Sequence, residues 1–148
     1  MEAVRAMAKR KRIGFAAHNE KKKELIECLK NYRNILSHHI LYGTGTTGSQ
    51  IQQELRLPVT LLHSGPLGGD QEMGAMIAKG ELDILIFLID PLNPHPHIYD
   101  IGALVRLAQV YNIACETTTT GIKFLLTSKL MEESCTREIP LTGYPSAH

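Results

Sequence analysis

The segment LYGTGTTGSQI at residues 41–51 places three glycines and three threonines between an apolar run and a helix-like segment. Gly43, Gly45 and Gly48 have the G-x-G-x-x-G spacing of a dinucleotide-binding loop. Glycines allow a tight turn and a close approach of the backbone, and the free amides of the following helix attract an anion. The threonine hydroxyls add donors on the same turn, which suits one compact phosphate. The candidate phosphate ligands here are Thr44, Gly45, Thr46 and Thr47.

The position of this loop argues against a dinucleotide. A dinucleotide-binding loop follows the first strand of its sheet, and the next strand ends in an acidic residue. Here the loop follows the second apolar run, and the next run ends in Ser64. The nearest acid, Asp70, lies beyond a Gly-Pro-x-Gly-Gly loop. We therefore exclude NAD and favour phosphate, with Thr46 as a plain helix N-cap kept as the alternative.

Further chemistry-bearing residues follow the first and third apolar runs. His18 ends the first run, and Lys22 lies one helical turn later within a run of three lysines. A charge-assisted hydrogen bond from Lys22 to phosphate would contribute roughly 1.5–3 kcal/mol, whereas the alternative is an ordinary surface lysine. Ser64 and Gly65 open the segment SGPLGGD, whose glycines let a substrate approach Asp70. Asp70 is a candidate general base, with a helix N-cap as the alternative.

The segment DPLNPHPHIYD at residues 90–100 is hard to explain as scaffolding. Asp90 ends the most apolar run of the chain, and His95, His97 and Asp100 follow it within ten residues. The prolines favour extended backbone at their neighbours, so the two histidines point to opposite sides. This disfavours a shared metal site, and we expect no metal. One imidazole, oriented by a carboxylate, would donate a proton near neutral pH.

Short apolar runs alternate with amphipathic segments, as in a parallel sheet covered by helices on both faces. We predict an α/β fold: a three-layer αβα domain with a five-stranded, mostly parallel, Rossmann-like sheet. Parallel sheets bind ligands at the carboxyl ends of their strands, so the candidate residues are expected at one edge. The predicted strands cover 12–17, 38–43, 59–64, 83–89 and 112–117, and the predicted helices cover 19–31, 46–55, 69–79, 99–111 and 119–129.

The whole chain of 148 residues suits one domain, 1–148, with an N-terminal arm at 1–11 and a tail at about 130–148. Sixteen basic residues against fifteen acidic ones leave no basic excess for nucleic acid, and the run Lys9–Arg12 is interpreted as solvated. The apolar run 84–89 is too short to span a membrane, and no signal peptide is expected. Three cysteines without C-x-x-C spacing predict free thiols in a reducing cytoplasm.

In order and spacing, the segments AAH, GTGTTG, SGPLGGDQEMGAMI, DILIFLIDPLNPHPHIYD and ALVRLAQVYNI resemble the motifs of the methylglyoxal synthase family over about residues 12–128. The combination of SGPLGGDQ with DPLNPHPH is highly specific. The resemblance implies a cytoplasmic lyase without a cofactor, which converts dihydroxyacetone phosphate into methylglyoxal and inorganic phosphate through an enediolate. It also implies a homohexamer that is inhibited by phosphate.

The resemblance also implies roles for individual residues. Asp70 would be the base that removes a proton from the hydroxymethyl carbon of the substrate. His97 would move protons between the carbonyl and hydroxyl oxygens, and Asp90 and Asp100 would be supporting carboxylates of the catalytic set. Substrate and phosphate would be bound by His18, Lys22, Thr44, Gly45, Thr46, Thr47, Ser64 and Gly65.

Two departures and two alternatives accompany this assignment. Asn19 stands where bacterial members of the family carry an acid, and residues after about 130 match the family weakly. The same domain type also occurs as a non-catalytic regulatory module that binds phosphate or other effectors. Retention of Asp70 and His97 favours an enzyme over that module. An isomerase acting on triose phosphates is a third possibility, and it would release no phosphate.

Overall fold

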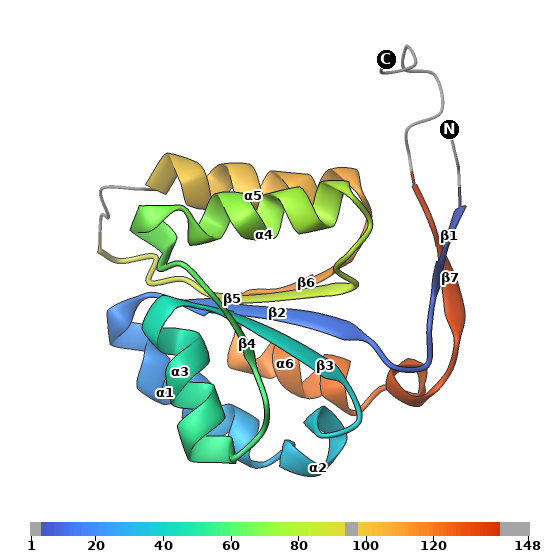
Figure 1. The fold of residues 1–148 in the computed structure, drawn as a ribbon, viewed down its shortest axis with the longest axis horizontal. Coiled ribbons are helices and arrows are strands. Elements are labelled where there is room, and N and C mark those ends of the chain that lie inside the picture. Colours follow the sequence, from blue (N-terminus) through green and yellow to red (C-terminus); the bar gives the residue numbers. More distant parts are fainter. Residues whose placement is uncertain (1–3, 94–97, 140–148) are drawn as a thin grey trace.

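The computed structural model describes residues 4–93 and 98–139, and its centre is a five-stranded sheet (Figure 1). The strand order is β4-β3-β2-β5-β6, and every neighbouring pair is parallel. The predicted α/β fold with a five-stranded sheet is therefore confirmed, with parallel pairing throughout. The strands are β2 (Arg12–Ala17), β3 (Ile40–Thr44), β4 (Thr60–Leu62), β5 (Ile84–Leu88) and β6 (Ala114–Glu116).

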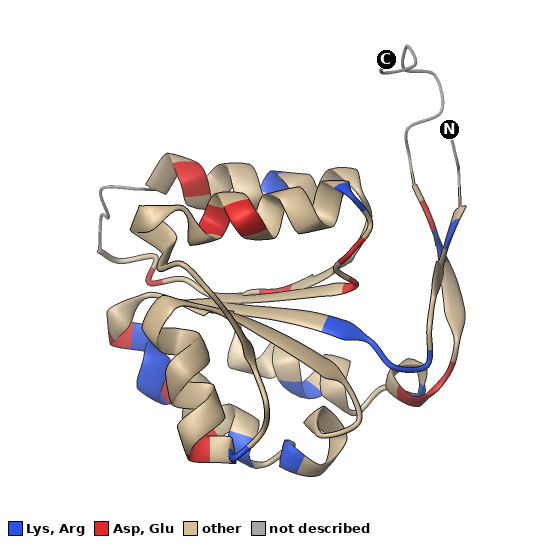
Figure 2. Ribbon diagram, viewed as in Figure 1, with Lys and Arg blue, Asp and Glu red and all other residues tan. Residues whose placement is uncertain are grey.

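Helices cover both faces of this sheet and produce the three layers (Figure 1). One face carries α1 (Asn19–Lys30), α3 (Gly45–Leu55) and α6 (Thr119–Leu126), with the short α2 (Arg33–Leu36) nearby. The other face carries α4 (Gly69–Ala78) and α5 (Ile98–Val110). Acidic and basic residues are interspersed along α1 (Figure 2).

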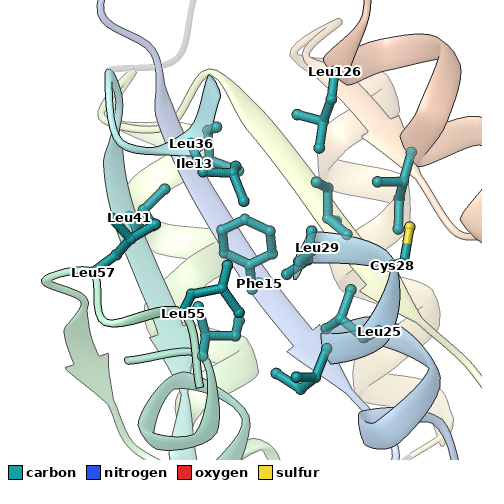
Figure 3. Packing of buried hydrophobic residues seen from close by; sticks show 14 of the residues in the cluster. Ile13, Phe15, Leu25, Cys28, Leu29, Leu36, Leu41, Leu55, Leu57 and Leu126 are labelled. Atoms are coloured by element: carbon teal, nitrogen blue, oxygen red, sulfur yellow. The ribbon is translucent and has the colours of Figure 1, made fainter. Parts of the chain in front are cut away.

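The central strands are apolar because both of their faces are covered. All five residues of β5 are buried, and a continuous apolar run is what a strand between two helical layers requires. On one face, Phe15 of β2 packs among Leu25 and Leu29 of α1 and Leu55 of α3 (Figure 3). Burial of each such side chain contributes about 1.5–3 kcal/mol, so this packing fixes the layers that position the site.

Most predicted elements lie where periodicity placed them, with differences at their ends. The third predicted strand, 59–64, is reduced to three residues in β4, which is an edge strand. The last predicted helix ends at Leu126 rather than 129, because a separate 3-10 turn, η2 (Lys129–Glu132), follows it. The three cysteines are free thiols, as predicted.

The two ends of the chain form an element that the sequence did not predict. Strand β1 (Val4–Met7) pairs antiparallel with β7 (Cys135–Glu138), and this two-stranded ribbon lies beside the main sheet (Figure 1). The interpretation of Lys9–Arg12 as solvated is wrong at Lys11, which is 2% exposed. Its Nζ donates hydrogen bonds to the backbone carbonyls of Ala8 and Glu133, and these bonds compensate the burial of the charge.

Candidate active site

A cavity of about 290 Å³ lies at the carboxyl ends of β2, β3 and β5. The loops after these strands converge there, as expected for a parallel sheet. The residues that enclose it come from the ends of the strands, the first turns of α1, α3 and α4, and the loop after β4. The predicted site residues that line it are His18, Lys22, Thr44, Gly45, Thr46, Thr47, Ser64, Gly65 and Asp70.

The first turn of α3 forms one wall of this cavity. Thr44 is the N-cap residue, and its side chain makes no capping hydrogen bond with the described residues. Thr46 lies inside the helix, so the alternative interpretation of Thr46 as the N-cap is wrong. Amides of a first helical turn have no partner within their helix, and they carry the positive end of the helix dipole. This wall is therefore suited to bind an anion.

The glycines of this turn serve close packing. A Cβ atom on Gly48 would lie 2.8 Å from the carbonyl oxygen of Gly43, which is closer than real Cβ contacts. Gly45 has a φ of 43°, and a Cβ on it would lie 2.7 Å from Cα of Ser64. The G-x-G-x-x-G spacing thus brings β3, α3 and the loop after β4 into contact around the cavity.

Lys22 extends from α1 toward the same turn of α3. Its Nζ donates hydrogen bonds to the side-chain oxygen of Asn19, at 2.8 Å, and to the hydroxyl of Thr46. Burial lowers the pKa of Lys22. Asn19 and Thr46 are neutral, and Lys22 forms no ion pair within residues 4–93 and 98–139, so its positive charge can bind an anion in the cavity.

His18 is held in one orientation at the start of α1. The side chain is buried, and Nδ1 accepts a hydrogen bond from the backbone N–H of Asp90 at 2.9 Å. The ring also makes an edge contact with Phe87, with 5.7 Å between ring centroids. Because Nδ1 is an acceptor, the imidazole is neutral and carries its proton on Nε2.

Asp70 is the buried carboxylate among the described residues that line the cavity. It is 3% exposed and is the second residue of α4, whose N-cap is Gly68. The alternative interpretation of Asp70 as the N-cap of this helix is therefore wrong. Its position in the first turn places a buried carboxylate at the positive end of a helix dipole, which stabilises the ionised form. A carboxylate beside a wall that is suited to bind an anion can act as a base.

Comparison with known proteins shows the family of the chain. A family model described as an MGS-like domain matches residues 24–117. Methylglyoxal synthase of Vibrio cholerae is 43% identical over 139 residues, covering 94% of this chain and 92% of that protein. Methylglyoxal synthase of Coxiella burnetii is 48% identical over 132 residues, covering 88% and 91%. The chain belongs to the methylglyoxal synthase family.

A solved structure of the methylglyoxal synthase family has the same fold. The crystal structure of methylglyoxal synthase from Elizabethkingia anophelis matches with a TM-score of 0.90 and 39% sequence identity. The match covers 97% of this chain and 95% of that one. The family resemblance predicted over about residues 12–128 is thus confirmed, and the structural match extends over 97% of the chain.

The other residues of the predicted catalytic set lie outside the cavity wall or outside the described residues. The carboxylate of Asp90 accepts hydrogen bonds from the backbone N–H of Leu92, at 3.2 Å, and from the side chain of Asn93. Asp90 thereby shapes the loop after β5 and holds His18 through its own backbone. Asp100 lies in the first turn of α5 and borders a groove between α4 and α5 that Asp70 also borders. His95 and His97 lie outside the described residues.

Six cavity residues of this methylglyoxal synthase family member were not among the predicted site residues: Ala16, Ala17, Asn19, Glu20, Pro66 and Phe87. Glu20 lies in the first turn of α1, Pro66 in the loop after β4, and Phe87 in β5. Nothing in the local sequence separates Phe87 from the other buried residues of its strand. The place of Phe87 in the cavity follows from strand pairing, since it is the partner of Ala16 on β2, which also lines the cavity. Glu20 could have been predicted from the sequence as a cavity residue, because it follows Asn19 directly after the end of the first predicted strand.

Proposed function

We propose that this chain is a methylglyoxal synthase, a lyase that converts dihydroxyacetone phosphate into methylglyoxal and inorganic phosphate without a cofactor. The observation that carries the proposal is the presence of Asp70, Lys22 and the first turn of α3 in one cavity. A volume of about 290 Å³ lies at the lower limit of ligand pockets. It therefore favours a small phosphorylated triose over a dinucleotide.

The first step is proton abstraction. The phosphate of the substrate binds to Lys22 and to the first turn of α3, which orients the hydroxymethyl carbon toward Asp70. Asp70 takes a proton from that carbon and leaves an enediolate, whose oxygens need hydrogen-bond donors. His18 offers its Nε2 proton to these oxygens, and His97 moves protons between them.

The second step is loss of phosphate. Electrons of the enediolate form a new C=C bond as the C–O bond to phosphate breaks, and the resulting enol tautomerises to methylglyoxal. The C–O bond to phosphate must stand out of the enediolate plane, so that it overlaps the π system while it breaks. The first turn of α3, with Thr44, Gly45, Thr46 and Thr47, would fix the torsion angle of this bond. Ser64 and Gly65 hold the substrate from the opposite loop. Asp90 and Asp100 are supporting carboxylates that orient the site around Asp70.

A non-catalytic effector-binding module is not favoured. Such a module would use the phosphate wall, yet it would not need a buried carboxylate in the same cavity. An isomerase would share the base and the enediolate. Release of phosphate separates the synthase from both alternatives.

The assembly and its regulation are also proposals. We propose a cytoplasmic homohexamer whose cavity is inhibited by its product, inorganic phosphate. Leu67, Leu92 and Tyr99 are 77%, 89% and 88% exposed, and such large apolar side chains near the site are suited to subunit contacts. Within the described residues, no helix has the length and apolar character needed to cross a bilayer. Sedimentation equilibrium tests the hexamer, and a monomer at micromolar concentration would contradict it.

The deciding experiment incubates the purified protein with dihydroxyacetone phosphate and quantifies methylglyoxal and phosphate together. We expect equal amounts of the two products. Asp70→Asn should lower kcat by about a hundredfold or more while phosphate still binds, because general-base catalysis contributes at least that much. Phosphate binding without product would favour the regulatory module. An active Asp70→Asn variant would leave the lyase but remove Asp70 as its base.

A further inference from the structure

Beside the cavity, His63 and Glu72 join the end of β4 to α4. The backbone N–H of His63 donates a hydrogen bond to Oε1 of Glu72 at 2.9 Å, and Nδ1 of its ring lies 2.7 Å from the same oxygen. Both contacts lower the pKa of Glu72, and the backbone hydrogen bond has the larger effect. Both side chains are on the surface, 71% and 39% exposed. One carboxylate oxygen therefore holds both the main chain and the side chain of His63.

The backbone of His63 also contacts the first turn of α3, the wall of the cavity that is proposed to bind phosphate. Its carbonyl oxygen accepts a hydrogen bond from the N–H of Gly45, the first residue of α3, at 3.2 Å. His63 thus has its N–H bound to α4 and its carbonyl bound to α3. The next two residues along the chain, Ser64 and Gly65, line the cavity.

The loop after His63 is closely packed and hydrogen-bonded to itself. A Cβ on Gly69, the first residue of α4, would overlap the carbonyl oxygen of His63. The carbonyl of Ser64 accepts hydrogen bonds from Leu67 at 3.0 Å and from Gly69 at 2.9 Å. Strand β4 pairs with β3 and is the edge of the sheet, so its outer side has no neighbouring strand in the described sheet. His63 directly follows this strand, and its N–H donates to the side chain of Glu72.

We propose that Glu72 is a positioning residue that acts through His63 to fix the substrate loop, Ser64 and Gly65, relative to Asp70. Glu72 and Asp70 lie two residues apart on the same helix, so the helix transmits the position of one to the other. The proposal rests on the proposed function of the cavity. An exposed ion pair contributes little to stability, whereas in the proposed function Ser64 and Gly65 hold the substrate, and their position depends on the contact of Glu72 with His63. Glu72 is thus expected to affect binding more than folding.

The test compares Glu72→Ala with Glu72→Gln and with the control Glu54→Ala. Glu54 is also an exposed helical glutamate in an ion pair, 3.4 Å from Lys30, and neither Glu54 nor Lys30 lines the cavity. We expect Glu72→Ala to raise KM for dihydroxyacetone phosphate and Kd for inorganic phosphate about threefold to tenfold, with kcat changed less. Its Tm should resemble that of Glu54→Ala. Glu72→Gln should restore most of the affinity, because its amide oxygen still accepts the N–H of His63.

Several outcomes would overturn the proposal. Equal KM and Kd values in Glu72→Ala and Glu54→Ala would do so, as would a loss in Glu72→Gln as large as in Glu72→Ala. His63→Ala keeps the backbone bond to Glu72, so it should fold and raise Kd less than Glu72→Ala; the reverse order would contradict the proposal. If the unaltered protein makes no methylglyoxal, the proposed function fails, and the phosphate Kd values still test the role of Glu72.

Discussion

At the scale of single residues, the candidate site depends on where charge is buried. Lys22 is partly buried beside a neutral amide and a hydroxyl, and Asp70 is buried in the first turn of a helix. A cation and a carboxylate thus line one small cavity. In the proposed function, the phosphate of the substrate binds to the cation and the carboxylate acts as the base.

The lowered pKa of Lys22 predicts a pH effect. The ammonium binds phosphate below its pKa, and the charge is lost as pH rises through that pKa. Because burial lowers the pKa from the ordinary 10.5, kcat/KM should fall at a lower pH than an ordinary lysine would allow. Lys22→Arg should move this alkaline limb upward, since a guanidinium stays charged.

The pH profile of kcat/KM is the measurement for this prediction. Lys23→Arg is the matched control, because Lys23 is the next residue of α1 and does not line the cavity. The control should leave the alkaline limb where it is. If the alkaline limb of the kcat/KM profile lies at the same pH in Lys22→Arg as in the unaltered protein, a group other than Lys22 causes it.

At the scale of secondary-structure elements, the contact between β3 and α3 shapes the phosphate wall. Gly48→Ala would bring a methyl group to 2.8 Å from the carbonyl oxygen of Gly43, and backbone atoms cannot rotate away. We expect unfolding free energy to fall by about 1–3 kcal/mol, and phosphate affinity to fall with it. Urea denaturation and phosphate titration measure the two effects.

Gly102→Ala is the control for this substitution. Gly102 lies in α5, is exposed, and has no atom within 4 Å of an added Cβ. Alanine is favoured over glycine inside a helix, so this variant should be more stable by up to about 1 kcal/mol. If Gly48→Ala were as stable as Gly102→Ala, the tight contact between β3 and α3 would not be needed.

At the scale of the whole molecule, a buried cluster attaches the ribbon of β1 and β7 to the main sheet. Lys11 reaches the carbonyls of Ala8 and Glu133, and its backbone N–H donates to Nδ1 of His39 at 2.9 Å. His39 is 5% exposed, and burial lowers its pKa from the ordinary 6.5. The attachment therefore requires a neutral imidazole.

This cluster predicts acid-sensitive stability. Below about pH 6.5, His39 becomes protonated in the unfolded chain but stays neutral in the folded chain. The unfolded state then binds more protons, so the free energy of unfolding decreases as the pH is lowered. The contribution is at most about 1.4 kcal/mol per pH unit, down to the lowered pKa. His39→Gln should flatten the dependence in urea titrations at several pH values. His38→Gln, whose side chain is 61% exposed, should not, and equal slopes in both variants would contradict the assignment.

Much of the site was predictable because its residues follow strands and glycine-rich turns. Local periodicity indicates where strands end, and parallel strands bring their ends to one edge. His18, Lys22, the threonine turn, Ser64, Gly65 and Asp70 were therefore grouped correctly before the structure. The N-cap alternatives for Thr46 and Asp70 could not be settled in advance, because helix starts are the least regular part of a periodic pattern.

The sequence by itself determined the α/β class, the family and the residues gathered at the cavity, because each of these depends on local patterns and short motifs. Only the tertiary structure decided that the two chain ends pair as β1 and β7, that Lys11 is buried, and that His63 links α3 to α4 through Glu72. Each of these depends on contacts between segments distant in the chain. Local propensity carries no information about which distant partner completes a hydrogen bond, so the packed fold must supply it.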